Sequence, residues 1–342
     1  MAMRITNSMM ATNYTRNLQR GYNRVSNLME QMTTNRRFAH ISDEPAAFLA
    51  GQRARYALTG VSDYQRTIDL AQSHLTQAED DLMEFNKLAV EAYDIVIDLA
   101  NDTKEPADRE NVSYKVAELR DHALMTLNSI FGDKYAMGGY NTTGTYPTPG
   151  AKTPPFTVDP NTGKLFFNGM DVTNPSVYTT FVEPAMKEVL TYDIGISSEM
   201  RVAVNGAAAV IFNVERDPIT NDVTKVSNLY NTLDDLYTTL KDPTITGVQL
   251  AADAGEFITP FQDAQRRVLA AVSEIGGKQN RLEMLDARYQ QDAINYIQMK
   301  SDAEDADEAE LIMQFKMTET VYKAALATGN YVLQPTLMDF IK

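Results

Sequence analysis

The hydrophobic pattern of the chain is dominated by one uninterrupted stripe between residues 47 and 99. Its members follow one another in steps of three and four residues, and each is apolar or aromatic. A repeat that averages 3.5 residues keeps one face of a helix against a partner, so it predicts a coiled-coil helix about 80 Å long. Such a helix needs a partner of comparable length. The stripe comprises Ala47, Ala50, Ala54, Ala57, Val61, Tyr64, Ile68, Ala71, Leu75, Ala78, Leu82, Phe85, Ala89, Ala92, Val96 and Leu99.

A second stripe of this kind occupies the C-terminal third, from Phe261 to Tyr331, and includes Leu282, Leu285, Met313 and Met317. Its polar exceptions are Lys278, Asp292, Glu310 and Thr320. The two stripes are predicted to pair with each other. Pro260 is expected to mark a helix start or a kink, and Gly276-Gly277 to loosen the helix locally at about 1 kcal/mol per glycine.

The first long helix has clear predicted ends. Ser42-Asp43-Glu44-Pro45 combines capping residues, acids and a first-turn proline, and Pro106 disfavours helix in the residue before it. A second helix is predicted over 107–131, and its short connection makes it an antiparallel neighbour of the first. Its apolar positions are Val112, Val116, Leu119, Ala123, Leu127 and Ile130.

The two ends of the chain carry opposite charges. Residues 1–42 hold six arginines and one acid, Glu30, and residues 301–342 hold eight acids and three lysines. A weaker helical stripe runs through the N-terminal segment at Leu18, Tyr22, Val25, Met29 and Met32. Exposed ion pairs contribute only about 0–1 kcal/mol each, so opposite charges are expected to steer the pairing of the two ends rather than secure it.

The middle of the chain differs from both ends in composition and in the elements that it predicts. Glycine and proline punctuate residues 131–198, and a β-hairpin is predicted for 156–168 around Pro160-Asn-Thr-Gly163. A further strand is predicted from Met200 to Gly206, and an amphipathic helix over 222–241.

The predicted fold class is therefore mainly α, a long coiled-coil helical rod formed by N- and C-terminal segments with a small inserted β-rich domain. The expected domains are terminal helical arms (1–42 and 301–342), the helical rod (43–135 and 245–300) and the β-rich insert with one short helix (136–244).

Composition excludes several kinds of chemistry. The chain has 342 residues, no cysteine and a net charge of −15, which argue against disulfides, thiolate metal sites and general nucleic-acid binding.

No segment reaches the roughly 18 apolar residues that cross a bilayer, and the first ten residues lack the apolar core of a signal peptide. His40, His74 and His122 show no metal-ligand spacing, and no phosphate loop or catalytic motif is present. No enzymatic activity, cofactor or metal is expected.

Three blocks of residues resemble the flagellin superfamily. The first joins Asn17-Leu18, Gln31-Met-Thr-Thr-Asn-Arg-Arg37 and Ser42-Asp-Glu-Pro45, with Asn35 where glycine is usual. The second is Gly276-Gly-Lys-Gln-Asn-Arg-Leu-Glu283. The third is Glu304-Asp-Ala-Asp307, followed by a helix and the tail Leu333-Gln-Pro-Thr-Leu-Met-Asp-Phe-Ile-Lys342. Within that superfamily, Tyr135-Ala-Met-Gly-Gly-Tyr-Asn-Thr-Thr143 and Pro154-Pro-Phe-Thr157 are more similar to the proteins of the hook-filament junction than to filament flagellin.

The resemblance implies a structural role in the bacterial flagellum, as an adaptor between the hook-side junction and the filament. It implies export without a cleavable signal peptide, an extracellular location, and terminal arms that fold on assembly. Its implied partners are other copies in a ring, hook-associated protein 1, flagellin and a cytosolic export chaperone, with no nucleic acid and no membrane insertion. The candidate assembly residues are Leu18, Tyr22, Val25, Met29, Met317, Leu326, Leu333 and Phe340, and the candidate rod residues are Leu75, Leu82, Phe85, Val96, Leu99, Leu282 and Leu285.

Three alternatives stay open at this stage. Filament flagellin is a polymer of the same class, and its inserted domain diverges freely. A cytosolic coiled-coil signalling hairpin would need no export and would have ordered ends. An enzyme with its site in 131–200 is the third, although nothing in the sequence favours it.

Overall fold

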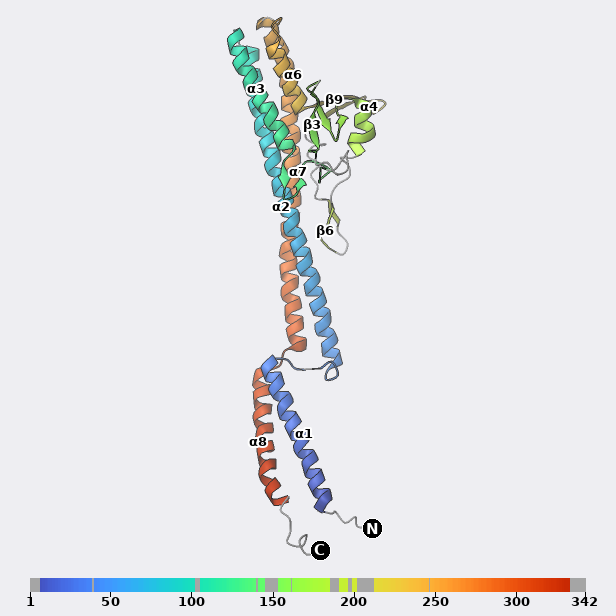
Figure 1. Ribbon diagram of the computed structural model, residues 1–342, viewed down its shortest axis with the longest axis vertical. Helices are drawn as coiled ribbons and strands as arrows, with labels where there is room; N and C mark the ends of the chain where they lie inside the picture. The colour runs from blue at the N-terminus through green and yellow to red at the C-terminus, as the bar shows by residue number, and fades with distance from the viewer. Residues whose placement is uncertain are drawn as a thin grey trace. The chain divides into compact units, whose positions relative to one another are not determined.

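The computed structural model describes residues 7–38, 40–101, 105–139, 141–144, 153–160, 162–184, 191–195, 199–201, 212–245 and 247–332. The long helices are α1 (Asn7–Thr34), α2 (Pro45–Asn101), α3 (Pro106–Leu127), α6 (Leu229–Lys241), α7 (Gly247–Glu304) and α8 (Glu308–Val332). The chain divides into two compact units, Met1–Ser62 with Tyr289–Lys342 and Asp63–Arg288. The helices α2 and α7 supply residues to both (Figure 1). The predicted mainly helical class with an inserted β-containing region is confirmed.

In the second unit, α2 and α7 run antiparallel. Gln65 donates to Asp286 over 3.1 Å, Gln279 to Glu79 over 2.9 Å, and Gln262 to the Tyr93 hydroxyl over 3.2 Å. The three contacts follow one another in opposite directions along the two helices. The two predicted stripes therefore pair with each other, as expected. The candidate rod residues Leu75, Leu82, Phe85, Val96, Leu99 and Leu282 are buried, and Leu285 is half-buried.

The helices α3 and α6 complete the helical part of this unit (Figure 1). Lys115 of α3 pairs with Glu91 of α2 over 3.0 Å. The Arg120 guanidinium donates to Asp234 of α6 over 2.8 Å. Because α3 packs antiparallel to α2, as predicted, its buried residues Val116, Leu119, Ala123 and Leu127 face the interior of the unit.

Two helix boundaries differ from the predictions. α3 ends at Leu127 rather than 131, and Ile130 lies exposed in the strand β1 (Ile130–Phe131), which turns through Gly132 at φ 64° into β2 (Lys134–Tyr135). α6 begins at Leu229 rather than 222, because residues before it form the strand β9 (Val223–Asn228). The Asn228 side chain accepts from the Asn231 N–H and so caps α6.

The prediction that Pro260 marks a helix start is wrong, whereas a kink at Pro260 and a local loosening at Gly276-Gly277 stay predictions. The helix begins at Gly247 and continues through Pro260 and the Gly276-Gly277 pair. Phe261 and Ala264, immediately after the proline, are buried, and so are Val268 and Ile275. These buried side chains keep α7 in the core on both sides of the glycine pair.

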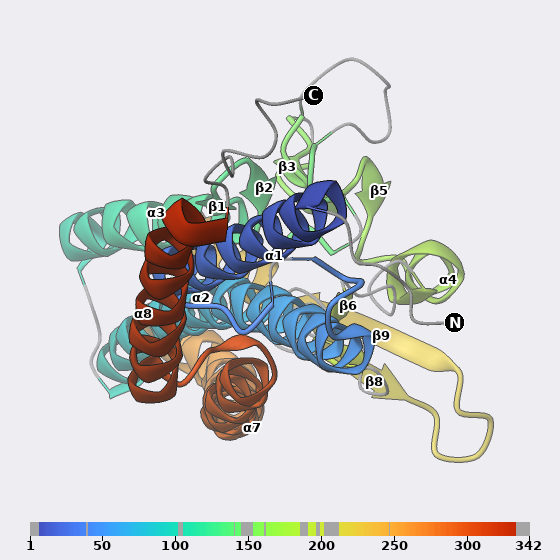
Figure 2. The same cartoon turned by 90° about the horizontal axis from the view of Figure 1, so that it is seen from below.

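The β-containing insert is built from short antiparallel pairs. β3 (Phe156–Val158) pairs with β4 (Leu165–Phe167) in the predicted hairpin, and β4 pairs with β5 (Met170–Asp171). A tight turn at Asn168 and Gly169, both with positive φ, joins these last two strands. β6 (Thr191–Asp193) pairs with β7 (Glu199–Arg201), and β8 (Phe212–Arg216) forms a two-stranded ribbon with β9 (Figure 2). The short helices α4 (Pro175–Val177) and η1 (Tyr178–Val182) lie between β5 and β6 in the sequence. Residues 202–206 of the predicted strand lie outside the described residues.

One asparagine attaches this insert to the helices. The Asn128 amide, just after α3, donates to the Phe156 carbonyl over 2.9 Å and accepts from the Phe156 N–H over 3.1 Å. It therefore satisfies both backbone groups of a strand residue, as a neighbouring strand would.

Candidate assembly surface

The first unit contains a helical hairpin of α1 and α8, here called the arm hairpin. The Tyr14 hydroxyl donates to the Ala325 carbonyl over 2.7 Å, and the Tyr22 and Tyr322 rings lie 6.3 Å apart. Gly21 faces Tyr322, where an added Cβ would lie 3.3 Å from the ring. The two helices are thus antiparallel. The resemblance implied arms that fold on assembly, and in this single chain both segments are helical over 7–34 and 308–332.

The arm hairpin buries few apolar side chains. Its contact stripes follow three-four spacing on both helices, but most members are small, polar or half-exposed. Among the described residues of α1 and α8, only Leu28 and Leu311 are buried large aliphatic side chains. The contact stripes are Ala11, Tyr14, Leu18, Gly21, Val25 and Leu28 on α1 and Leu311, Phe315, Thr318, Tyr322, Ala325 and Gly329 on α8. Apolar burial contributes about 25 cal/mol per Å², so this contact is the less stable part of the fold.

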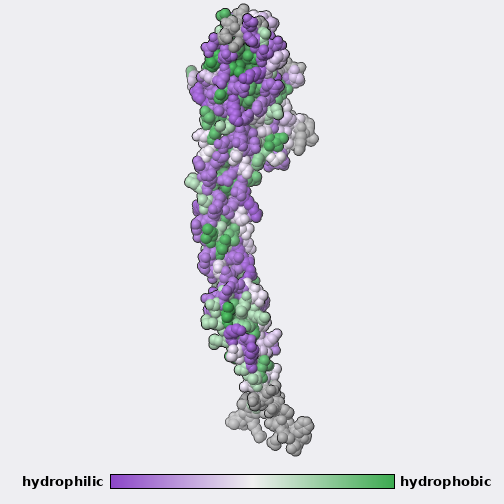
Figure 3. All heavy atoms as spheres, turned by 90° about the vertical axis from the view of Figure 1, so that its left-hand side faces the viewer, coloured by the Kyte–Doolittle hydropathy of each residue, from purple (hydrophilic) through white to green (hydrophobic). Residues whose placement is uncertain are grey.

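The large apolar side chains of the arm hairpin are instead mostly exposed. Figure 3, viewed from the α8 side, shows green residues interspersed with purple ones on the arm hairpin. Met317 is 70% exposed. The exposed set on these two helices is Met9, Met10, Tyr22, Met29, Met32, Ile312, Met313, Met317, Val321 and Leu326. Exposed apolar surface of this extent is typical of a protein interaction site.

The candidate assembly residues fall into three groups. Leu18 and Val25 are half-buried in the contact between α1 and α8. Tyr22, Met29, Met317 and Leu326 are exposed. Leu333 and Phe340 lie outside the described residues. The sequence pattern does not predict the burial of Leu28 and Leu311. On α1 it predicts Met29 as the inward-facing residue, whereas Leu28 is buried there.

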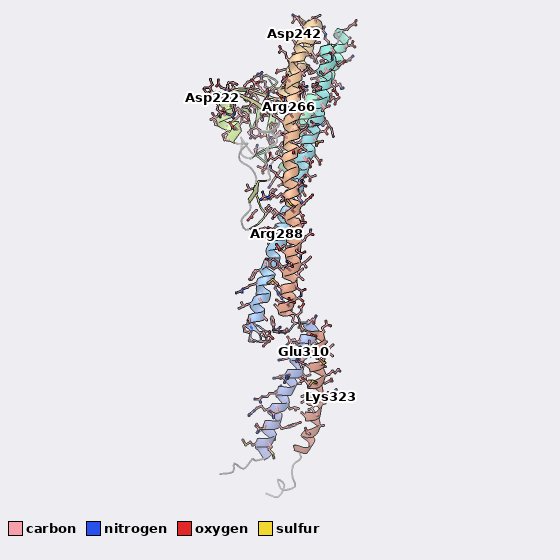
Figure 4. All side chains as sticks on the ribbon, turned by 180° about the vertical axis from the view of Figure 1, so that it is seen from behind. Asp222, Asp242, Arg266, Arg288, Glu310 and Lys323 are labelled. Atoms are coloured by element: carbon pink, nitrogen blue, oxygen red, sulfur yellow. The ribbon has the colours of Figure 1, made fainter. Side chains whose placement is uncertain are left out.

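The C-terminal stripe does not keep its register to Tyr331. Residues Asp305, Ala306 and Asp307 interrupt the helix between α7 and α8. After this break the inward-facing positions of α8 lie one or two residues later than predicted, so Met313 and Met317 face solvent. Figure 4 shows α8 with Glu310 and Lys323 labelled along it.

Backbone hydrogen bonds join the segment between α1 and α2 to the segment between α7 and α8. The Arg37 N–H donates to the Glu304 carbonyl over 2.8 Å, and the Ala306 N–H donates to the Asn35 carbonyl over 3.3 Å. Asn35 has φ 52°, a left-handed conformation that asparagine tolerates, which agrees with its place in a motif where glycine is usual. The two connections are therefore fixed to each other.

Side chains reinforce this junction. The buried Glu304 carboxylate pairs with Arg55 of α2. Arg37 pairs with Glu44, and its guanidinium lowers the pKa of that carboxyl through a hydrogen bond. The Asp43 carboxylate accepts from the His40 N–H over 3.0 Å and so closes the turn before α2, whereas the sequence suggested it as a cap of the helix.

The expected charge pairing of the two arms does not occur within the arm hairpin. In the described parts of α1 and α8, no ion pair joins the helices; Lys316 and Lys323 both pair with Glu319 inside α8. Arg16, Arg20 and Arg24 recur every four residues and are exposed on α1. Most acids of the C-terminal arm lie near residues 302–310, at the other end of the hairpin from these arginines, and Glu319 is paired within α8.

The described residues show neither a membrane helix nor a metal cluster. None of the helices carries an apolar stretch long enough to cross a bilayer. No group of three or more His, Cys, Asp or Glu side chains is placed to hold a metal ion among these residues.

Long helices from both ends of the chain pair with each other, with a β-containing insert between them, and this arrangement agrees with the fold that the resemblance to the flagellin superfamily implies. Residues 5–142 match the family model for the bacterial flagellin N-terminal helical region. The chain is 22% identical over 312 residues to flagellar hook-associated protein 3 of Escherichia coli (strain K12), and this covers 86% of each chain.

Two solved structures have the same fold. A putative flagellar hook-associated protein from Vibrio parahaemolyticus superposes with a TM-score of 0.59 at 17% identity, over 77% of this chain and 100% of that one. Flagellar hook-associated protein 3 from Legionella pneumophila gives 0.56 at 12% identity, over 73% and 97%. The chain therefore has the fold of these two proteins, and its N-terminal part is similar to the flagellin N-terminal helical region.

Proposed function

We propose that this chain is a structural component of the bacterial flagellum, an adaptor that joins the hook-side junction to the filament. The similarity to hook-associated protein 3 over 86% of both chains supports this role. The observation that carries it is the arm hairpin, whose large apolar side chains lie mostly outside its own contact. Such a surface is suited to burial between subunits.

In this proposal the protein acts by assembly and catalyses no reaction. The terminal arms (1–42 and 301–342) form subunit contacts through Leu18, Tyr22, Val25, Met29, Met317, Leu326, Leu333 and Phe340. The helical rod (43–135 and 245–300) supports them through its buried seam. The insert (136–244) contains none of the arm residues, so this role leaves its sequence free to vary.

The partners follow from the same role. Copies of the chain form a ring, which meets hook-associated protein 1 on one side and flagellin on the other. A cytosolic chaperone holds the chain before export, which uses no cleavable signal peptide and delivers it to the extracellular flagellum.

Self-assembly of the purified protein tests the adaptor role against that of filament flagellin. Precipitant such as ammonium sulfate is added to concentrated protein, and the products are examined by electron microscopy. An adaptor is expected to give no long filaments, because its ring is completed by other proteins. Long filaments formed by this chain alone would contradict the adaptor role.

A further inference from the structure

One face of α2 holds the segment that leads from α3 into the insert. His74, Gln77 and Asp81 follow one another at three- and four-residue spacing, so they lie on the same side of the helix. The Ser129 hydroxyl donates to the Asp81 carboxyl, and the Phe131 ring of β1 lies 4.5 Å from the His74 imidazole. This segment is therefore held against α2 at two points, a carboxyl and an imidazole.

A second strand pair contacts the same imidazole. The Tyr192 ring of β6 lies 5.7 Å from the His74 ring at an interplanar angle of 62°, and Tyr192 is half-buried. Among the described elements, β6 pairs with β7 and has few contacts with any other (Figure 1). β1 is attached more firmly, because the Ser129 hydroxyl next to it binds Asp81. The contact with His74 is thus a main attachment of β6 to α2.

The surroundings of His74 disfavour a positive charge on its ring. The imidazole is half-buried, and the ammonium of Lys134 on β2 is the charged group that acts on it. Burial, and then the Lys134 charge, lower the pKa of His74 below its ordinary value of 6.5. The Tyr192 hydroxyl stays neutral, because burial raises its pKa. The contact between the rings is therefore one between neutral groups at neutral pH.

The acids around this contact are engaged elsewhere or exposed. Asp81 lies two turns away along α2, where its carboxyl is bound by Ser129. Asp193 follows Tyr192 on β6, so its side chain faces the other side of the strand, and it accepts from the Gly195 N–H over 3.1 Å. Asp133, in the turn between β1 and β2, is exposed. In the part of the chain that the structure describes, no carboxylate is paired with the imidazole to compensate a charge on it.

We propose that His74 is a pH-sensitive contact between α2 and the insert, at which protonation of the imidazole releases Tyr192 and moves β6 and β7 away from the helix. The charged ring needs water that the two aromatic rings exclude. β1 stays in place, because Ser129 keeps its bond to Asp81. The folded chain binds this proton less readily than the unfolded chain, so the contact is complete above pH 6.5 and is lost as the pH falls below that value. The contact lies within the second unit, so it needs no assembled ring.

A fluorescent reporter tests the release, because the natural chain has no tryptophan. In the full chain with Y192W, acrylamide quenching is measured from about pH 8 to about pH 5. The proposal predicts that quenching rises severalfold below pH 6.5 while circular dichroism stays unchanged. H74F keeps an aromatic ring without a titrating group, so quenching in Y192W/H74F is expected to stay low throughout. H122F removes an exposed imidazole from α3 and is the matched control, in which the response is expected to persist.

The natural chain gives a second readout that needs no reporter. In an NMR titration of the ¹³C-labelled histidines, the His74 signal is expected to titrate below pH 6.5, and K134Q is expected to raise its midpoint. D81N separates the two attachment points and should leave both the midpoint and the release in place. A quenching response that is absent, that survives H74F, or that coincides with loss of helix content would overturn the proposal. A His74 midpoint above pH 6.5 would also overturn it, since the two rings would then stabilise the imidazolium.

Discussion

Gly51 of α2 lies against the buried side chain of Glu304, the last residue of α7. A Cβ at position 51 would lie 2.7 Å from the Glu304 Cγ, closer than such atoms approach. Glu304 is 4% exposed, pairs with Arg55, and accepts the Arg37 N–H at its carbonyl. One residue thus joins α2 to the connection that leads from α1.

Gly51→Ala is therefore expected to destabilise the first unit by about 1–3 kcal/mol, because Glu304 must leave its pair with Arg55. Gly60→Ala is the matched control on the same helix, since nothing lies within 4 Å of an added Cβ there. That variant should stabilise by about 0.5–1 kcal/mol. Urea unfolding followed by circular dichroism measures both, and equal effects would show that Glu304 does not need the space at position 51.

Assembly should depend on exposed apolar residues of the arm hairpin and not on those elsewhere. Met317→Asp on α8 and Met125→Asp on α3 replace methionines that are 70% and 72% exposed, so neither should change unfolding by more than about 0.5 kcal/mol. Only Met317→Asp is expected to abolish incorporation into flagella. The measurement is complementation of motility in cells that lack the natural protein, and equal complementation by both variants would reject the arm surface.

Burial predicts different outcomes for two other pairs of aspartate substitutions. Leu82→Asp or Phe85→Asp places an unpaired charge in the core and should cost more than about 4 kcal/mol, which unfolds the monomer. Leu18 and Val25 are half-buried, so aspartate at either position should leave the second unit folded and abolish assembly. Limited proteolysis separates the cases, and the division into a stable rod and assembly arms would be wrong if both pairs behaved alike.

Asp81 makes the second unit sensitive to pH. Burial raises the pKa of its carboxyl, although hydrogen bonds from Ser129 and Gln77 oppose the rise. The folded chain therefore holds this proton above pH 3.8, the ordinary value, and stability falls as pH rises through the raised pKa.

Asp81→Asn is thus expected to raise the melting temperature by about 2–4 °C at pH 7 and to have little effect below pH 3.8. Asp69→Asn, at an exposed position of α2 that does not contribute to the pKa shift of Asp81, serves as the control and should change neither. A melting temperature lowered by Asp81→Asn at pH 7 would show that the ionised carboxylate stabilises the fold.

The sequence predicts those parts of the fold that depend on local repeats. The stripe from Ala47 to Leu99 identifies α2 and its long partner, because a 3.5-residue repeat has few other structural solutions. Val223 and Val226 continue the spacing of α6, so the sequence alone predicts a helix over 223–228. Pairing with β8 makes it a strand instead, and that choice depends on tertiary contact rather than on local pattern.

The candidate surface was predicted in part for a similar reason. The spacing predicts the apolar positions of α8, but the three-residue break at 305–307 changes which of them face α1. Glu304 gave no local signal, because its partners Gly51 and Arg55 lie about 250 residues away. Long-range pairs of this kind need the folded structure.

The location of the protein in isolated flagella tests the central claim most directly. Immunogold labelling of intact flagella, with antibody raised against the insert, should place gold particles only at the boundary between hook and filament. Labelling along the whole filament would contradict the adaptor role and favour a filament flagellin, and its absence from flagella would reject a flagellar role.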